Sequence, residues 1–193
     1  MGTSGKAILC LIALCLALPA SADPYAKIGG AYGWGYRSAN SVSPLHGAGL
    51  DIHAGVNKDR VDLEFNYLYL QGFKYQRSVE RRDSVGTYIA NETTDSKLQG
   101  YMGAMNFRIL RNSFQPYATF GVGLMMVQHT TSVTESGRVA RYLINQEAMG
   151  ACTKAGGGFS WKVHEHLSLY GESVLWSGPM RFFTGQLGLI VRP

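Results

Sequence analysis

Three polar residues near the C-terminus have the types and spacing of a catalytic set. His166 and Ser168 are separated by one residue, and Glu172 follows shortly after them. A serine hydroxyl becomes a nucleophile when an adjacent imidazole takes its proton, and a carboxylate can orient that imidazole. We therefore consider Ser168 as a candidate nucleophile, His166 as its base and Glu172 as the orienting group.

Other residues could bind a metal or react as a thiol, but their spacing argues against both. His164 and His166 share one short polar segment without a third ligand nearby, whereas structural metal sites use about four ligands. Cys152 is the only cysteine outside the N-terminal leader described below, so no internal disulfide is expected. We expect exposed histidines, a buried Cys152, and neither a metal nor a cofactor site.

Basic residues gather in the polar segment 73–96, and acidic residues balance them. The basic ones are Lys74, Arg77, Arg81 and Arg82, and the acidic ones are Glu80, Asp83, Glu92 and Asp95. A balanced segment is typical of a solvated loop, although arginines also bind lipid phosphates or outside partners. The net charge of +5 is dispersed and forms no basic patch interleaved with aromatics, so we expect no nucleic-acid partner.

The N-terminus has the pattern of a secretory signal peptide. Lys6 precedes the apolar run 7–18, and Ala20-Ser21-Ala22 has the small-residue spacing of a cleavage site. The run is too short to span a bilayer as a helix. We therefore predict a signal peptide at 1–22, an exported protein, and one folded domain at 23–193.

The composition suggests that part of the exterior does not face water. Charged residues make up 16% of the chain, against roughly 25% in an average soluble domain. The 24 glycines also exceed the usual share of about 7%. No segment after the leader approaches the ~20 apolar residues of a membrane helix, so a membrane-spanning structure would have to be a closed barrel.

Eight segments alternate residue by residue between an apolar side chain and a small or polar one, which is the period of two of a β-strand. They are residues 25–36, 45–56, 60–71, 97–110, 115–128, 150–163, 167–176 and 181–193. The clearest pair occupies 97–128, with a turn at 111–113. Gly121 and Gly123 fall on the polar face of their strand, where a missing side chain relieves crowding.

The connections between these segments alternate in length. Tight turns are predicted at 57–59, 111–113 and 164–166, and the longer polar connections include 38–44, 73–96 and 129–147. Outer-membrane barrels have short periplasmic turns and longer extracellular loops. We therefore predict an all-β fold, an eight-stranded antiparallel up-and-down transmembrane β-barrel.

The two faces of the predicted strands differ in a way that favours lipid outside. Aromatic residues near strand ends lie on the apolar face: Tyr32, Trp34, Tyr36, Tyr67, Tyr69, Phe159 and Trp161. The opposite face carries Asp51, Asp62, Glu64 and Glu172 beside Arg60, Arg108, Lys154, Lys162 and Arg192. An eight-stranded barrel is just wide enough for side chains, so these charges should pair into a plug rather than line a pore.

These segments resemble the small eight-stranded outer-membrane barrels of Gram-negative bacteria, the OmpA/OmpX-type and opacity-like porin families. Residues 115–127, 155–172 and 185–189 carry the likeness, which covers the whole chain after the leader. His166-x-Ser168 is also similar to the His-x-Ser pair of outer-membrane lipid A deacylases, although the surrounding residues do not match that family. The predicted topology places both histidines at a periplasmic turn, away from outer-leaflet lipid.

The resemblance implies a porin-like, non-enzymatic protein of the cell outer membrane with no catalytic residues. We expect a monomer that contacts outer-membrane lipid and lipopolysaccharide. We also expect a structural or surface-interaction role, with an extracellular ligand bound through loops 73–96 and 129–147. The alternatives are a lipid-modifying enzyme and a soluble periplasmic ligand-binding barrel. Against the soluble barrel, this chain lacks the Gly-x-Trp signature of lipocalins, because Tyr32 rather than glycine stands two residues before Trp34.

Overall fold

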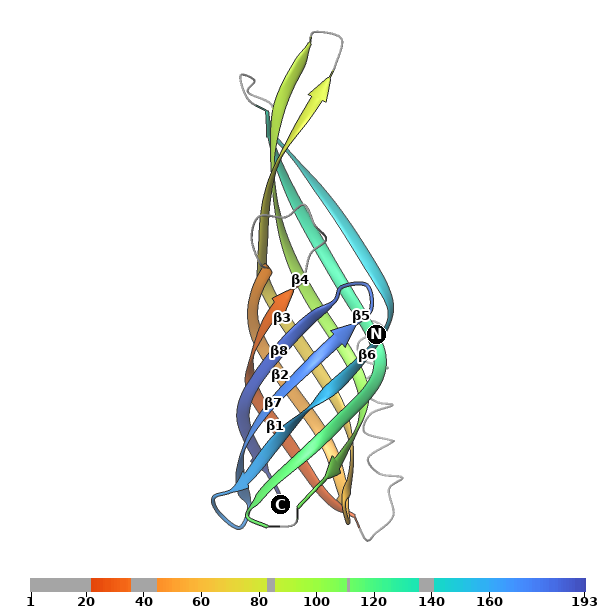
Figure 1. Ribbon diagram of the computed structural model, residues 1–193, viewed down its shortest axis with the longest axis vertical. Helices are drawn as coiled ribbons and strands as arrows, with labels where there is room; N and C mark the ends of the chain where they lie inside the picture. Colours follow the sequence, from red (N-terminus) through yellow and green to blue (C-terminus); the bar gives the residue numbers. More distant parts are fainter. Residues whose placement is uncertain (1–21, 36–44, 83–85, 111, 136–140) are drawn as a thin grey trace, which may run out of the picture.

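The eight predicted strands form one closed barrel in which each strand pairs antiparallel with its sequence neighbours (Figure 1). The computed structural model describes residues 22–35, 45–82, 86–110, 112–135 and 141–193. The strands are β1 (Asp23–Gly35), β2 (Leu45–Lys58), β3 (Val61–Arg82), β4 (Thr87–Arg108), β5 (Phe114–Glu135), β6 (Arg141–Lys162), β7 (Leu167–Ser177) and β8 (Phe182–Val191). Pairing of β1 with β8 closes the ring. The predicted fold class is confirmed.

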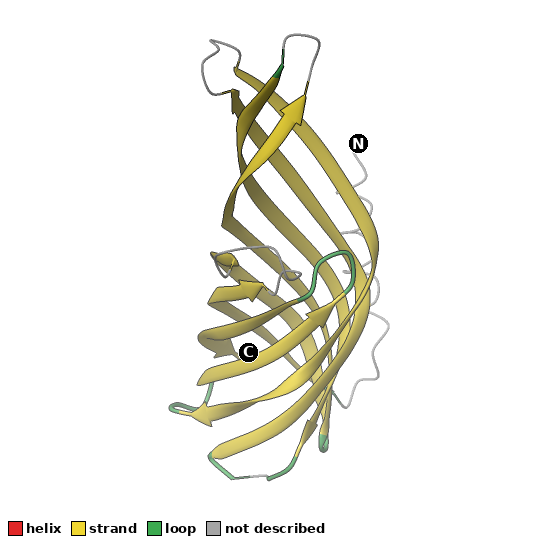
Figure 2. Ribbon diagram, turned by 45° about the horizontal axis from the view of Figure 1, so that its top comes forward, coloured by secondary structure: helices red, strands yellow, loops and turns green. Residues whose placement is uncertain are grey.

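The strands fall into two lengths. β3, β4, β5 and β6 each have 22 residues, whereas β1, β2, β7 and β8 have 10 to 14. The four long strands therefore continue as a curved sheet past the rim that the short strands form (Figure 2). We call this part the extension: residues 72–82, 87–98, 129–135 and 141–149.

The extension corrects the predicted loops at 73–96 and 129–147. β3 and β4 stay paired up to Arg82 and Thr87, and β5 and β6 up to Thr134 and Arg141. Apolar alternation is absent there because both faces of the sheet are largely polar. In addition, the register shifts between Leu70 and Phe73, where Gly72 adopts a φ of 88°. This bulge breaks the period of two, so the sequence pattern could not reveal the strand.

Some predictions lie on residues outside the described part of the chain. The signal peptide at 1–22 does so except for Ala22, as do Tyr36, the connection 38–44, and Arg111 of the predicted turn. Within the described residues, no helix has the length and apolar character needed to cross a bilayer.

The outside of the barrel carries an apolar band between two belts of aromatic residues. One belt contains Tyr32, Trp34, Tyr67, Tyr69 and Tyr101, and the other contains Phe107, Phe114, Phe159 and Trp161. Rings meet within each belt, for example Tyr67 with Tyr101 at 5.2 Å and Phe114 with Phe159 at 5.5 Å between centroids. Such belts mark the two membrane interfaces of outer-membrane barrels. The predicted outward orientation of the apolar faces is confirmed. Val56 is an exception: alternation along 45–56 predicts that it faces outward with Leu50 and Ile52, but it is buried opposite Pro24.

At the end nearer the extension, the apolar band gives way to polar residues that accept hydrogen bonds from tyrosines of the first belt. The Tyr69 hydroxyl donates to Gln71 at 3.1 Å, and the Tyr101 hydroxyl donates to Gln99 at 3.3 Å. Beyond them the outward side chains of the extension are mostly hydroxyl, amide or charged, which suits water rather than hydrocarbon.

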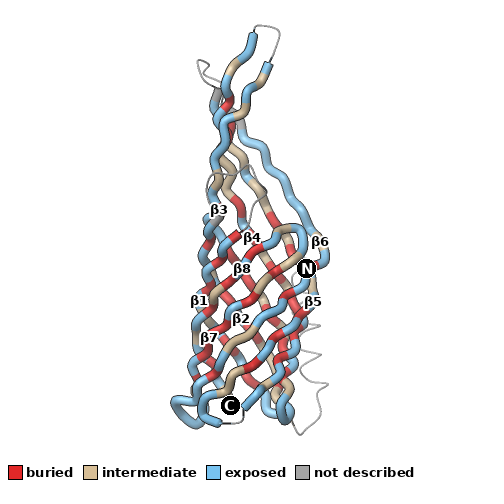
Figure 3. Tube along the Cα trace, viewed as in Figure 1, coloured by how far each residue is buried: buried red, intermediate tan, exposed pale blue. Residues whose placement is uncertain are grey.

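The core of the molecule lies inside the barrel, where buried residues alternate with exposed ones along each strand (Figure 3). Small residues allow the strands to lie close together. A Cβ on Gly123 would lie 1.9 Å from the carbonyl oxygen of Tyr101 on the neighbouring strand, so no larger residue fits without moving the backbone.

Candidate functional site

The part of the lumen nearer the short turns is filled by a buried ionic cluster. Glu64 lies at its centre and is contacted by Lys27 Nζ at 2.8 Å, by Tyr25 Oη at 2.9 Å and by His53 Nδ1 at 2.9 Å. The other ring nitrogen of His53 contacts Asp51. None of these side chains has significant exposure.

Lys154 joins this cluster to the opposite wall of the barrel. Its Nζ lies 3.2 Å from Glu172 and 3.9 Å from Glu64, and Tyr117 Oη donates to Glu172 at 2.9 Å. A separate pair, Arg108 with Asp62 at 3.0 Å, lies nearer the turns. Removing one member would leave a partner charge unpaired in a low-dielectric interior, so the cluster acts as a crosslink of the lumen.

The prediction that the inward charges pair into a plug is therefore confirmed for most of the residues named. Arg192 donates to Ser168 Oγ at 2.7 Å and also lies at this end of the barrel. Arg60 and Lys162 are exceptions: both are exposed, because Arg60 precedes β3 in the turn and Lys162 is the last residue of β6. Sequence reasoning did not assign a role to Lys27 or to the buried tyrosines, although their alternation already placed them on the inner face.

The other part of the lumen is apolar. Its buried residues are Ala31, Leu68, Leu70, Phe73, Leu98, Met102, Met125, Val127, Cys152, Val174, Trp176 and Phe182. The rings of Trp176 and Phe182 stack at 5.8 Å, and Phe73 meets Phe182 edge-on at 6.2 Å. Cys152 is buried as predicted and lies with its sulfur 3.2 Å from that of Met102. This apolar plug separates the ionic cluster from the extension.

The candidate catalytic set is not assembled. His166 is exposed and its Nδ1 contacts the backbone carbonyl oxygen of Pro193 at 3.2 Å. Ser168 is buried and accepts its hydrogen bond from Arg192 rather than donating to an imidazole. Glu172 is engaged by Tyr117 and Lys154. The described residues also contain no group of three side chains able to hold a metal ion.

The inner face of the extension carries a second charge cluster, in which a buried Glu92 is bound by two partly exposed arginines. Arg77 lies 2.6 Å from Glu92 Oε2, and Arg81 lies 2.6 Å from Glu92 Oε1. Burial alone would raise the pKa of the Glu92 carboxyl, but the hydrogen bonds and charges of Arg77 and Arg81 outweigh it and lower the pKa below its ordinary value. Three of the eight charged residues predicted for 73–96 thus pair across β3 and β4: Arg77, Arg81 and Glu92.

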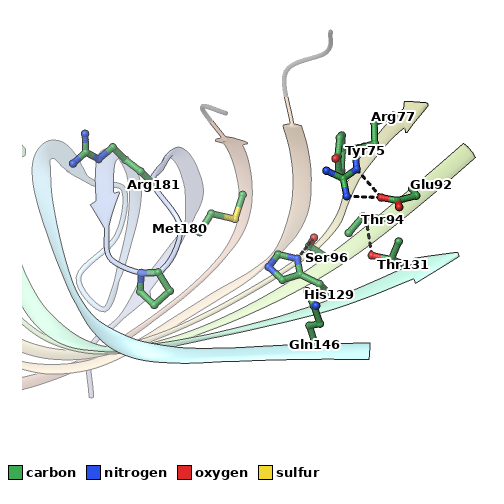
Figure 4. Close-up of a pocket in the computed structure, with 11 residues that line it drawn as sticks. Tyr75, Arg77, Glu92, Thr94, Ser96, His129, Thr131, Gln146, Met180 and Arg181 are labelled. Carbon is green, nitrogen blue, oxygen red and sulfur yellow. Dashed lines mark hydrogen bonds and ion pairs between the residues drawn. The ribbon is translucent and has the colours of Figure 1, made fainter. Parts of the chain in front are cut away.

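A hollow of about 400 Å³ lies between this inner face and the turn that joins β7 to β8 (Figure 4). Its lining residues are Tyr75, Arg77, Glu92, Thr94, Ser96, His129, Thr131, Gln146, Pro179, Met180 and Arg181. Two pairs link neighbouring strands across its wall: Thr94 with Thr131 at 2.9 Å and Ser96 with His129 at 2.7 Å. Met180 also packs against the apolar plug, which closes the hollow from below.

The extension has two open edges with different residues. Pairing of β2 with β3 ends at Gln71, so residues 73–82 of β3 have no neighbour on that side within the described chain. This edge carries five charged residues: Lys74, Arg77, Glu80, Arg81 and Arg82. Pairing of β6 with β7 begins at Thr153, and Gly178 and Pro179 lie against residues 150–152, so residues 143–149 have no paired strand on that side within the described chain. Every residue from 143 to 149 is exposed, and Glu147 is the single charged residue among them.

Comparison with protein families decides which class of barrel this is. The model of the outer membrane protein beta-barrel domain family matches residues 7–173. The chain belongs to this family. The protein is therefore an integral β-barrel of the outer membrane. Such barrels have short periplasmic turns and longer extracellular connections, so we expect the extension to lie outside the cell.

Solved structures of outer-membrane barrels share this fold. The chain is similar to Ail, the attachment invasion locus protein of Yersinia pestis, with a TM-score of 0.58 and 12% identity over 89% of this chain and 99% of Ail. A structure of Ail with the heparin analogue sucrose octasulfate gives a TM-score of 0.56 at the same identity and coverage. A major outer membrane protein of Thermus thermophilus gives 0.51 and 11% identity, over 87% of this chain and 99% of that protein. No curated protein sequence matches the chain.

Proposed function

We propose that this protein is a monomeric, non-enzymatic surface-interaction protein whose extension captures an extended segment of a partner protein. The observation that carries the proposal is the open edge of β6 at residues 143–149. An exposed strand edge offers a row of unpaired N–H and C=O groups, and an extended peptide can add to it as a further strand.

The contrast between the two edges of the extension supports this choice of strand. Charges, especially lysine, protect an edge against strand addition, and the β3 edge carries five charged residues. The β6 edge has neither lysine nor proline between 143 and 149. Leu143 is 65% exposed and Met149 is 69% exposed, so apolar side chains of an added strand would find neighbours there.

The membrane-embedded surface supports the expectations about lipid and oligomeric state. The apolar band is carried by all eight strands, which suits a single barrel surrounded by lipid. Lys74 and Lys97 point outward just beyond the band and are exposed, where they would meet the phosphates of lipopolysaccharide.

A matched pair of variants tests strand addition. The refolded protein in lipid nanodiscs would be panned against a library of ten-residue peptides. We expect enriched peptides without proline, with alternating apolar residues and a basic residue opposite Glu147. Leu143→Lys should then weaken peptide binding at least about tenfold, because it adds a charge to the edge.

Ile89→Lys is the control, because Ile89 is 53% exposed on β4, an interior strand of the extension. It should leave peptide affinity within about twofold, because β4 has no open edge. Equal losses in the two variants would mean that peptides bind the outer face of the sheet, and the proposal of strand addition would be rejected.

A further inference from the structure

We propose that the hollow beneath the extension is a binding site for an acidic saccharide, meaning a sugar unit that bears a carboxylate or a sulfate group. This site lies on the inner face of the extension and is separate from the β6 edge, so it does not depend on strand addition. The shape of the hollow, its hydrogen-bonding groups and its charge support this assignment.

The shape restricts what can bind. The volume of about 400 Å³ lies within the range of small-molecule sites, roughly 300–1,000 Å³. One wall is the four-stranded inner face of the extension, and the other is the turn bearing Pro179, Met180 and Arg181 (Figure 4). The apolar plug closes the floor, so a ligand enters from outside the cell and is held there rather than transported.

The hydrogen-bonding groups match a polyhydroxylated molecule. Hydroxyls of Thr94, Thr131 and Ser96, the imidazole of His129 and the amide of Gln146 come from three adjacent strands. Hydroxyl and amide groups both donate and accept, as sugar hydroxyls do. The Tyr75 ring, Pro179 and Met180 add apolar surface for the C–H faces of a sugar ring.

The charge of the hollow selects an acidic ligand. Glu92 is its single carboxylate, and Arg77 and Arg81 both bind it. Arg181 is exposed and forms no hydrogen bond or ion pair with any residue that the structure describes. Two guanidinium groups, those of Arg77 and Arg181, thus line the hollow beside one carboxylate, which Arg81 also neutralises. Arg77 is 53% exposed and engages Glu92 through Nε and Nη2, which leaves further N–H donors for an anionic oxygen.

Calorimetric titration of the refolded protein in nanodiscs tests this site with three probes. They are a sulfated heparin disaccharide, a hyaluronan disaccharide that carries only a carboxylate, and neutral maltose. We expect at least one acidic disaccharide to bind, maltose to bind at least about tenfold more weakly, and the acidic affinity to fall as salt rises. The two acidic probes distinguish a sulfate site from a carboxylate site.

Two variants locate the binding. Arg181→Gln removes a charge that pairs with no described residue, and Arg77→Gln leaves Arg81 to neutralise Glu92. Both variants should therefore fold and keep the heat-modifiable gel mobility of the barrel. Each should weaken the acidic disaccharide at least about fivefold, as expected for a lost charge-assisted hydrogen bond. The control Lys74→Gln removes the same charge from the outward face of β3 and should change the affinity by less than about twofold.

Three outcomes would overturn the proposal. They are no binding of either acidic probe at millimolar concentration, equal binding of maltose, and an equal loss in Lys74→Gln, which would indicate non-specific attraction to a basic surface. Peptide binding at the β6 edge is measured separately, so failure of one site leaves the other result interpretable.

Discussion

Ion pairs occur both in the eight-stranded barrel and in the extension, into which only β3 to β6 continue. Inside the barrel, Lys154 contacts Glu64 and Glu172 with no exposed surface. In the extension, the Arg77 side chain that binds Glu92 is half exposed. Water cannot satisfy buried charges, so the barrel pairs fix a structure, whereas the exposed part of Arg77 remains accessible from outside and forms part of the proposed ligand site. The comparison separates a rigid scaffold from an interaction surface.

The largest expected effect comes from breaking the buried cluster. Lys154→Met leaves Glu172 and part of the Glu64 charge unpaired and should reduce the free energy of unfolding by about 3–5 kcal/mol. Urea titration in lipid vesicles would measure it. Lys162→Met is a matched control on the same strand, because Lys162 is exposed, and Arg77→Gln is the matched change in the extension; each should cost under about 1 kcal/mol. Similar losses of unfolding free energy in all three variants would contradict the claim that the ion pairs of the barrel stabilise the fold more than those of the extension.

The apolar plug should give the next largest effect. Leu98 is a fully buried member of the plug, and Leu98→Ala should cost about 2–5 kcal/mol of unfolding free energy, because it removes packed methyl groups and leaves a cavity. Leu124→Ala serves as the comparison, since Leu124 faces lipid and is 51% exposed. Lipid can fill the space that Leu124 leaves, so a clearly smaller loss is expected there. A larger loss at Leu124 would contradict the packed lumen.

The smallest expected effect is the loss of the Glu92 ion pairs at low pH. The folded-state pKa of Glu92 is lowered, so its contribution to the extension is complete above the ordinary carboxyl pKa of about 4.3 and is lost as pH falls through the lower folded value. Nuclear magnetic resonance in nanodiscs should show the Glu92 carboxyl titrating below the ordinary midpoint. In the double variant Arg77→Gln/Arg81→Gln the midpoint should return towards it. An unchanged midpoint would mean that the arginines do not hold this carboxylate.

The barrel could be predicted from the sequence because its two faces meet different solvents. Phe120 faces lipid and the next residue, Gly121, faces the lumen, so the residue types alternate along the strand with the surroundings of each position. The extension could not be predicted in the same way, because water touches both of its faces and the bulge at Gly72 shifts the period. The hollow lies between Arg77 and Arg181, which are far apart in the chain. Only closure of the barrel brings β3 near the turn that precedes β8.

Hydrogen–deuterium exchange along β6 tests the central claim most directly. In the free protein, alternate amides between residues 143 and 149 should exchange rapidly because they point to the open edge, while amides of residues 153–162, paired on both sides, should be protected. Binding of a selected peptide should protect the rapidly exchanging set. Full protection of residues 143–149 without a partner, or peptide binding that leaves their exchange unchanged, would contradict an interaction edge on β6.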